Sequence, residues 1–371
     1  LQKQQATWEN SLTNWINDSY YSDWCSKIMN LKNEITKIHY NIKSNAWLEP
    51  ILDFMSIFYS KITEIRNDLF DRGILESEKV DAYVISVGNL TTGGVGKTPV
   101  VAELAKHFIS QGKKVAIISR GYGGKLSNKE PRVISANNEI FYTAEEIGDE
   151  PFWFAQNINN AYVLTCSSRV KAANEAIKRF GVEIIILDDA FQHRKIKRDL
   201  NLVLVDSEKM FGNGKHLPAG PLRENLNGLK RADKLLIMNK TAKTVDANIL
   251  ENIFDTRKTF VCNVVPSFTY NIKTTEVLPL KSDVFAMCAI GQPEQFYEFV
   301  RQKFNLLDTL TFDDHHQYKY NEVAKLHGNI VTTEKDAVKL AQFNLDNIYA
   351  LKLKLELDIE SILKWVTLTK L

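Results

Sequence analysis

From residue 82 onward, the pattern of apolar and polar residues predicts strands that alternate with helices. Continuous short apolar runs are typical of buried strands, and apolar residues that recur every three or four positions are typical of helices. We expect strands at 83–87, 115–119, 162–166, 183–187, 202–205 and 234–238, and helices at 98–110, 152–158 and 168–180. Strands without polar alternation, separated by helices, indicate a parallel sheet covered on both faces. The predicted fold class is therefore α/β.

A second and smaller α/β unit is predicted towards the C-terminus. Two β-like segments at 260–265 and 275–278 flank Pro266 and predict a hairpin, followed by strands at 284–290, 329–332 and 348–352 with helices at 293–304 and 335–342. The expected organisation is an N-terminal extension at 1–44, an amphipathic helix at 45–73, a main domain at 74–258, a β-hairpin linker at 259–280 and a C-terminal domain at 281–371.

The region before residue 74 contains two helical patterns. Residues 1–44 are polar, a helix is predicted at 27–40, and no function follows from this segment. Between Trp47 and Arg72, ten apolar residues form one wide face that charged residues interrupt. From the pattern alone, packing on the protein's own core is favoured. The alternative is a helix that lies in a membrane surface with its aromatic residues among the headgroups.

Composition and charge exclude several classes of protein. The 371 residues carry a net charge of +2, whereas proteins that coat nucleic acid are usually strongly basic, so no nucleic acid partner is expected. No apolar stretch reaches the roughly 20 residues needed to cross a bilayer, and the first thirty residues lack a signal-peptide pattern. The four cysteines at 25, 166, 262 and 288 form no CxxC pair, which predicts free buried thiols in a reducing cytoplasm.

The strongest chemical signal is a glycine-rich loop between a strand and a helix, at residues 84–98. Its glycines allow backbone N–H groups to surround phosphate oxygens at a helix N-terminus. Lys97 would reach the β- and γ-phosphates and the Thr98 hydroxyl would bind Mg²⁺. Thr91 stands where the strict P-loop motif has glycine. The predicted nucleotide-binding residues are Thr91, Thr92, Gly93, Gly94, Val95, Gly96, Lys97 and Thr98.

Two carboxylate positions each allow two interpretations. Asp188 follows an apolar strand and would either bind Mg²⁺, as in P-loop enzymes, or cap a helix; with Lys97 and Thr98 present, the metal role is favoured. Asp149 stands before Pro151 and a helix, so it would either cap that helix or accept a proton from an attacking hydroxyl. The sequence favours neither role for Asp149.

Two further features carry charge or titratable groups. His315 and His316 follow two aspartates and would either handle protons or simply lie in an exposed loop. Between Arg194 and Lys234, ten basic residues stand against five acidic ones, a local charge of +5. This tract would either face an anionic acceptor or be a solvated surface.

Nine sequence blocks together resemble the tetraacyldisaccharide 4′-kinase family, the lipid A 4′-kinases. They are VGNLTTGGVGKTP, ISRGYGG, GDEP, SSRVKAA, ILDDAFQH, RDLNLVLVD, LPAGPLRE, DDHHQY and VTTEKDAVKL, within residues 87–340. The resemblance extends from Trp47 to the C-terminus and includes Thr91. It implies a P-loop NTPase-like kinase, with ATP and Mg²⁺ as cofactors, that phosphorylates the 4′-hydroxyl of tetraacyldisaccharide 1-phosphate. The product would be lipid IVA.

The resemblance also implies roles for particular residues. Asp149 matches the catalytic base, helped by His315 or His316, and Lys97 and Thr98 match residues that hold phosphates and Mg²⁺. The metal and phosphate environment would include Asp188, Asp189 and Gln192; other active-site or phosphate contacts would be Arg120, Glu150, Arg169, His193, Arg223 and Glu224. The sequence departs from the family at Ala190, usually glycine, and at Asn225, usually proline.

The resemblance implies a membrane partner as well. Acyl chains of the substrate remain in the bilayer, which gives the apolar helix at 45–73 a reason to dock there. We expect a peripheral enzyme on the cytoplasmic face of the bacterial inner membrane, without an obligate protein partner. The alternative is a P-loop GTPase or ATPase switch without a lipid substrate. Against it, Asn239-Lys240-Thr241-Ala242 has alanine where guanine-binding proteins have aspartate.

Overall fold

The computed structural model describes residues 31, 33–241, 244–290, 293–313 and 316–364. These residues divide into two compact units. The larger one consists of Leu69–Met210 and Leu226–Leu371, and the smaller one of the chain up to Asp68 together with Phe211–Asn225. Each unit is described by itself.

The larger unit is built on one sheet, whose first half is the predicted parallel sheet. β1 (Tyr83–Asn89) lies between β6 (Ile184–Asp188) and β7 (Leu200–Asp206), and the order continues outward through parallel strands. On the β6 side follow β2 (Val115–Ser119) and β5 (Ala161–Thr165), then the antiparallel β3 (Arg132–Ala136) and β4 (Glu139–Ile140). On the β7 side lies β8 (Lys234–Asn239). The predicted α/β class is confirmed.

Helices cover both faces of this half of the sheet. α3 (Lys97–Ser110) and α5 (Asp149–Asn157) contribute to the core on one face, while α6 (Arg169–Phe180) packs its alanines on the other. Neighbouring residues of β1 illustrate the two faces, because Ile85 belongs to the first core and Val84 to the second. This double coverage explains the continuous apolar strands. The short α4 (Ala144–Ile147) precedes α5.

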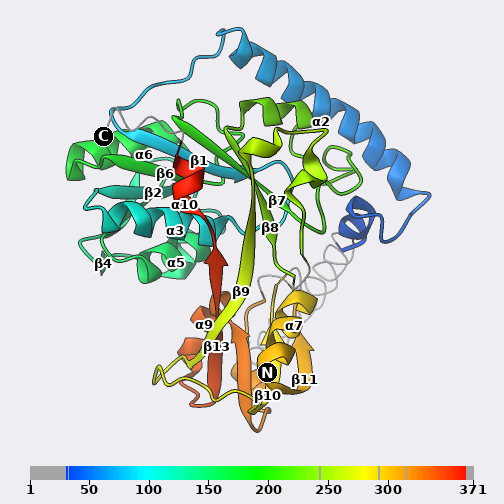
Figure 1. Cartoon of the computed structure of the whole chain (residues 1–371), viewed down its shortest axis with the longest axis vertical. Coiled ribbons are helices and arrows are strands. Elements are labelled where there is room, and N and C mark those ends of the chain that lie inside the picture. The colour runs from blue at the N-terminus through cyan, green and yellow to red at the C-terminus, as the bar shows by residue number, and fades with distance from the viewer. Residues whose placement is uncertain (1–30, 32, 242–243, 291–292, 314–315, 365–371) are drawn as a thin grey trace, which may run out of the picture. The chain divides into compact units, whose positions relative to one another are not determined.

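The second half of the sheet is joined to the first through one long strand. β9 spans Thr259–Asn271 and pairs in parallel with β8 and then antiparallel with β13 (Ile348–Glu356), as Figure 1 shows. A hairpin of two short β-segments was expected around Pro266. Its first segment is longer than predicted, because β9 continues through Pro266 with a register irregularity at this residue, which has no N–H for the ladder. The segment 275–278 folds back on the end of β9 through an antiparallel bridge between Tyr270 and Val277, as a hairpin requires.

The remaining elements complete the α/β pattern. β12 (Asn329–Thr333), β10 (Asp283–Cys288) and β11 (Asn305–Thr311) follow β13 in the sheet, so the order of strands is β11-β10-β12-β13-β9-β8-β7-β1-β6-β2-β5-β3-β4. The helices are α7 (Pro293–Lys303), α8 (Tyr320–Val323), α9 (Glu334–Leu340) and α10 (Ile359–Leu363). β3, β4 and β11 were not predicted. Cys166, Cys262 and Cys288 are free and buried as expected, and Cys25 lies outside the described residues.

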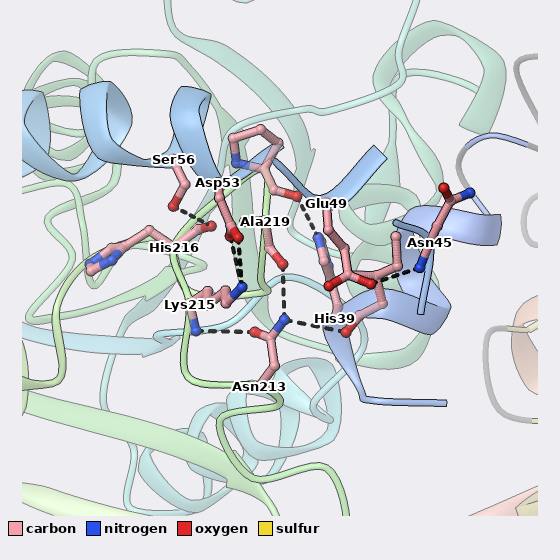
Figure 2. A network of polar contacts seen from close by, with 11 residues as sticks. His39, Asn45, Glu49, Asp53, Ser56, Asn213, Lys215, His216 and Ala219 are labelled. Carbon is pink, nitrogen blue, oxygen red and sulfur yellow. Dashed lines mark hydrogen bonds and ion pairs between the residues drawn. The ribbon is translucent and has the colours of Figure 1, made fainter. Parts of the chain in front are cut away.

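The main helix of the smaller unit is α2, which spans Leu48–Asp71 and belongs to this unit up to Asp68. Other segments of the unit pack on it. Of the helix predicted at 27–40, residues 33–39 are helical in the structure, and residues 27–30 and 32 lie outside its description. The Lys215 ammonium forms an ion pair with Asp53 (2.8 Å), and the Ser56 hydroxyl donates to the His216 carbonyl (3.0 Å), as Figure 2 shows. These contacts tie the segment that leads into the LPAGPLRE block to α2.

Within the smaller unit, the apolar face of α2 is mostly exposed, so this face does not pack on the core of that unit, as the pattern alone had favoured. The buried residues of α2 are Leu52, Ser56 and Thr63, whereas seven of its large apolar side chains are more than half exposed. They are Ile51, Phe54, Met55, Ile57, Phe58, Ile62 and Ile65, and Trp47, directly before the helix, is exposed as well. Among the described residues, none of the helices combines the length and apolar character needed to cross a membrane.

Candidate active site

The glycine-rich loop lies at the carboxyl end of β1, as predicted. β1 ends at Asn89, and α3 begins at Lys97 directly after Gly96. Gly96 has a φ of 104°, a conformation that costs a residue with a Cβ atom strain, and it forms the N-cap of α3. The loop therefore presents its backbone at the positive end of a helix, an arrangement that binds phosphate.

Lys97 is held inside this loop by two oxygen acceptors. Its ammonium lies 3.2 Å from the Asn89 Oδ1 atom and 3.4 Å from the Asp189 Oδ1 atom, and its side chain is 11% exposed. Asn89 is fully buried, donates to the Thr91 carbonyl and accepts from the Gln192 amide through its own carbonyl. Asn89 thus connects the loop, the lysine and the DDAFQH block. Sequence reasoning did not single it out.

The DDAFQH block lies against β1 because Gly88 leaves room for it. A Cβ atom at Gly88 would lie 2.6 Å from the Phe191 Cβ atom, far inside van der Waals contact. Ala190 is fully buried and does not have a positive φ, so its backbone does not require the glycine usual in the family. The departure at Ala190 is compatible with the local geometry.

Asp188 is the last residue of β6 and is 2% exposed. Residues 189–199, all of them described, contain no helix, so the interpretation that Asp188 caps a helix is wrong. Burial raises its pKa, and the charges of Glu150 and Asp189 raise it further, against the lowering effect of Lys97 and Arg169. Its Oδ1 atom is buried and has no hydrogen-bond partner among the described residues. A buried carboxylate oxygen of this kind fits a ligand for a cation.

The donor set suits Mg²⁺. Thr98, Asp188 and Asp189 offer hydroxyl and carboxylate oxygens, and Mg²⁺ is usually held by one or two carboxylates together with substrate phosphates and water. Within the described residues, no group of three or more His, Cys, Asp or Glu side chains has the arrangement of a metal site. A site that depends on phosphate oxygens does not need such a group.

Asp149 is the first residue of α5, and Gly148 occupies the N-cap. The capping interpretation is therefore wrong for Asp149 as well. Gly148 has a φ of 95°, and a Cβ atom there would lie 2.4 Å from the Tyr122 carbonyl oxygen, so only glycine lets the GDEP block lie against the RGYGG loop. The positive end of α5 favours the ionised carboxylate. The Lys339 ammonium lies 3.7 Å from the Asp149 Oδ2 atom.

The two candidate histidines differ in what the structure describes. His315 lies outside the described residues. The ring of His316 stacks on Phe312, with centroids 4.5 Å apart, and its Nε2 atom lies 3.0 Å from the Glu322 Oε2 atom. The bond with His316 holds the pKa of Glu322 below its usual range. The described contacts of the His316 ring are thus made within its own loop.

Arg169 contacts the end of β6, and its charge acts on His193. Arg169 is 3% exposed and donates to the carbonyls of Cys166 (2.7 Å) and Asp188 (3.3 Å), so its guanidinium anchors the end of β6. Burial and the surrounding cations, Arg169 first among them, lower the pKa of His193 to about 4, so its ring is neutral near pH 7. Arg120, one of those cations, is exposed.

Arg223 and Glu224 belong to the smaller unit, where they contact α2. Glu224 is fully buried and accepts a hydrogen bond from the Asn67 amide (2.9 Å). The Arg223 carbonyl accepts from the Tyr59 hydroxyl (3.0 Å). Both contacts hold the end of the LPAGPLRE block on the helix.

Part of the basic tract at 194–234 serves the fold. Arg198 donates to the carbonyls of Ala190 and Phe191, and the Arg231 guanidinium lies over the Phe191 ring at 4.8 Å. Arg194 pairs with Asp71. These cations hold the DDAFQH block and the end of α2 rather than forming a solvated surface.

Lys240 is a site residue that sequence reasoning used only as part of an incomplete guanine-binding motif. Its ammonium donates to the Gly94 carbonyl (2.7 Å) and to the Asp206 Oδ2 atom (3.1 Å). Burial alone would raise the pKa of Asp206, but Lys240 and backbone N–H donors hold it below its usual range. This lysine fixes the glycine-rich loop from β8.

A glycine-rich loop at a helix N-terminus, a lysine inside it and carboxylates at the end of the neighbouring strand define a P-loop phosphotransferase. The family model described as tetraacyldisaccharide-1-P 4′-kinase (LpxK) matches residues 48–369. The chain belongs to this family, and it is a kinase that acts on a hydroxyl group.

Individual relatives agree with the family match. A tetraacyldisaccharide 4′-kinase of Halothermothrix orenii is 35% identical over 346 residues, which cover 83% of this chain and 88% of that protein. One of Haemophilus influenzae is 36% identical over 309 residues, 82% of this chain and 87% of that protein. The crystal structure of "apo" form LpxK from Aquifex aeolicus in complex with ATP covers 87% of this chain and 99% of its own, at 32% identity and a TM-score of 0.73. The resemblance stated from the sequence is confirmed, and the switch-protein alternative is not favoured.

Proposed function

We propose that the protein transfers the γ-phosphate of ATP to the 4′-hydroxyl of a tetraacylated glucosamine disaccharide 1-phosphate, giving lipid IVA. The observation that carries the site assignment is the position of Lys97 at the start of α3, held against Asp189 beside the buried Asp188. Family membership supports the lipid acceptor, and the ATP bound in the related Aquifex aeolicus structure supports the nucleotide.

In this proposal the nucleotide phosphates bind Thr91–Thr98. Backbone N–H groups of the loop and the positive end of α3 receive the β-phosphate, while Lys97 leaves Asn89 and Asp189 for the γ-phosphate. Thr98, Asp188, Asp189 and Gln192 are the residues that would hold Mg²⁺, which neutralises charge on the phosphates when bound. Phosphoryl transfer asks mainly for positioning and charge neutralisation, and these residues supply both.

Asp149 is the proposed base for the sugar hydroxyl. A sugar hydroxyl is too weak an acid to ionise unaided, so a carboxylate must accept its proton as the phosphorus–oxygen bond forms. Glu150 and Arg120 are proposed to contact the substrate, and His193 to do so as an uncharged ring. Arg223 and Glu224 are proposed to act through the LPAGPLRE block, which they hold on α2. The burial of Arg169 supports a positioning role beneath Asp188.

The direct test is a transfer assay. The full chain is incubated with γ-³²P-ATP, Mg²⁺ and tetraacyldisaccharide 1-phosphate in detergent, and lipids are separated by thin-layer chromatography. A labelled lipid is expected. If the protein hydrolysed GTP as fast as ATP, and lipid did not stimulate the hydrolysis, a switch protein would be supported instead.

Of the two histidines, His315 is proposed to assist Asp149, because the His316 ring nitrogen Nε2 is bound to Glu322. Replacing His315 with alanine is expected to lower kcat by roughly a hundredfold, the lower range for lost proton-transfer assistance. Replacing His316 with alanine is expected to cost less than tenfold in kcat and to lower the melting temperature. Equal losses of kcat in the two variants, at equal melting temperatures, would contradict this assignment.

Membrane docking through α2 is the second part of the proposal. We place the protein peripherally on the cytoplasmic face of the bacterial inner membrane, where ATP is available and the acyl chains of the acceptor lie in the bilayer. The seven exposed apolar side chains of α2 support this, since an apolar helix face that lies in the headgroup zone buries its area there.

A double substitution on this face tests the docking. Phe54 and Phe58 are 62% and 57% exposed, and their rings are in edge-to-face contact. Changing both to serine is expected to weaken partition onto anionic lipid vesicles by about tenfold or more, because roughly 25 cal/mol is lost per Å² of apolar area no longer buried. Vesicle co-sedimentation measures this. Leu280→Ser, at a 69% exposed leucine of the larger unit, is the matched control. Unchanged partition of the double variant would place the docking surface elsewhere.

A further inference from the structure

Lys339 is a nearly buried lysine that joins two parts of the proposed site. Its side chain is 8% exposed, and its ammonium lies 3.7 Å from the Asp149 Oδ2 atom. The same ammonium donates to the His316 carbonyl oxygen at 3.3 Å. A lysine this buried needs acceptors close by, because desolvation disfavours its charge. Among the described residues, the ammonium therefore contacts the proposed base and the backbone of His316.

The helix that carries Lys339 is fixed to the sheet. The Thr333 side chain caps α9 by accepting from the Asp336 N–H, and the Asp336 carboxylate accepts from the Thr333 hydroxyl (2.8 Å) and the Ala289 N–H (3.0 Å). Asp336 and Leu340 are fully buried. The position of the Lys339 backbone is therefore set by the ends of β10 and β12 rather than by the segment that contains His316.

Structural contacts account for several polar residues of the VTTEKDAVKL block that precede Lys339. Thr333 and Asp336 fix the start of α9, and Glu334 accepts from the Tyr270 hydroxyl at 3.4 Å on β9. None of these contacts involves the Lys339 side chain, whose ammonium lies beside Asp149 of α5 instead. Capping of α9 therefore does not explain why residue 339 is a lysine, whereas the contact with Asp149 does.

We propose that Lys339 is a positioning residue for phosphoryl transfer. It holds the Asp149 carboxylate in its proton-accepting orientation and, through the His316 carbonyl, keeps the His316 backbone near that carboxylate. This rests on the role of Asp149 proposed above. The ammonium donates a hydrogen bond to the His316 carbonyl and forms an ion pair with the Asp149 carboxylate at 3.7 Å. One cation on a fixed helix thereby couples the position of the base to that of the His316 backbone.

Loss of this cation affects turnover more than binding. Misplacement of a reacting group by about 1 Å costs up to roughly a hundredfold in rate. The nucleotide loop does not depend on Lys339, since Lys97 contacts Asn89 and Asp189. For Lys339→Met, which retains the apolar stem, we expect kcat to fall by about 10- to 100-fold while KM for ATP changes less than about threefold.

The experiment compares four single variants with the wild-type chain in the γ-³²P-ATP assay. Lys339→Met and Lys339→Gln are expected to lose turnover, and Lys339→Arg to recover most of it because it restores a cation. Lys325→Met, at an exposed lysine of the same region, is the matched control and should behave as wild type. Melting temperatures are measured for each. If Lys339→Met does not fold, Lys339→Gln carries the test.

A double-mutant cycle separates positioning from a merely structural role. In an Asp149→Asn background, Lys339→Met should lower kcat less than about threefold further, because the group it positions has lost its function. A full loss in both backgrounds, or failure of arginine to restore turnover at a normal melting temperature, would overturn the proposal. If Lys339→Met transferred phosphate as fast as the wild type, this proposal would be overturned and the proposed function would stand. A wild-type chain that labels no lipid would overturn the proposed function with it.

Discussion

Replacing Lys97 with methionine is expected to lower kcat by about a thousandfold, with unfolding behaviour close to that of the wild type. The ammonium is 11% exposed and is held 3.2 Å from the Asn89 Oδ1 atom and 3.4 Å from the Asp189 Oδ1 atom. In the proposed complex this ammonium exchanges those two acceptors for the γ-phosphoryl group, where it stabilises the charge that develops during transfer. Methionine keeps the stem that packs in the loop and removes only that charge.

The measurement is single-turnover transfer of ³²P to the lipid at saturating ATP, with nucleotide affinity determined separately by calorimetry. Affinity is expected to fall much less than kcat, because loop N–H groups and the end of α3 still bind phosphate. Lys106→Met is the matched control: it lies on the same helix, where it pairs with Glu103 at the surface. A loss of less than tenfold for Lys97→Met would show that the loop lysine does not act on the transferred phosphoryl group.

The parts of the fold that the sequence predicted are those that depend on local patterns. The strand–loop–helix around Lys97 follows from an apolar run, glycine spacing and a helical period, all within about thirty residues. β11 was missed because most of its residues are exposed or only partly buried, so it lacks the apolar run of an inner strand. The length of β9 could not be predicted, since it depends on pairing with β13, about eighty residues further along the chain.

Roles that depend on distant contacts were also beyond the sequence. Lys240 and Gly94 are 146 positions apart, and no local pattern indicates that one donates to the other. For Asp149 and Asp188, the local sequence fitted a helix cap as well as a catalytic or metal-binding role. The capping role is excluded only by the structure, in which Gly148 is the N-cap of α5 and Asp188 ends β6. The apolar face of α2 was assigned to a core because periodicity identifies a face but not what covers it.

Replacing Asp149 with asparagine is expected to lower kcat by roughly 10²- to 10⁴-fold, the usual contribution of a general base. Asparagine has nearly the same shape and still fits the first turn of α5 behind Gly148, so the loss reports on the charge and basicity of the carboxylate.

The matched control is Glu145→Gln, at an exposed carboxylate on α4 that pairs with Lys125. It removes one negative charge four residues away and should leave kcat as in the wild type. The Asp149 variant should also lose its dependence on Lys339, whose ammonium lies 3.7 Å from the carboxylate. If Asp149→Asn transferred phosphate within tenfold of the wild-type rate, a different group would have to accept the hydroxyl proton. Glu150, the next residue on α5, would then be the first to test, because its charge already acts on the buried Asp188.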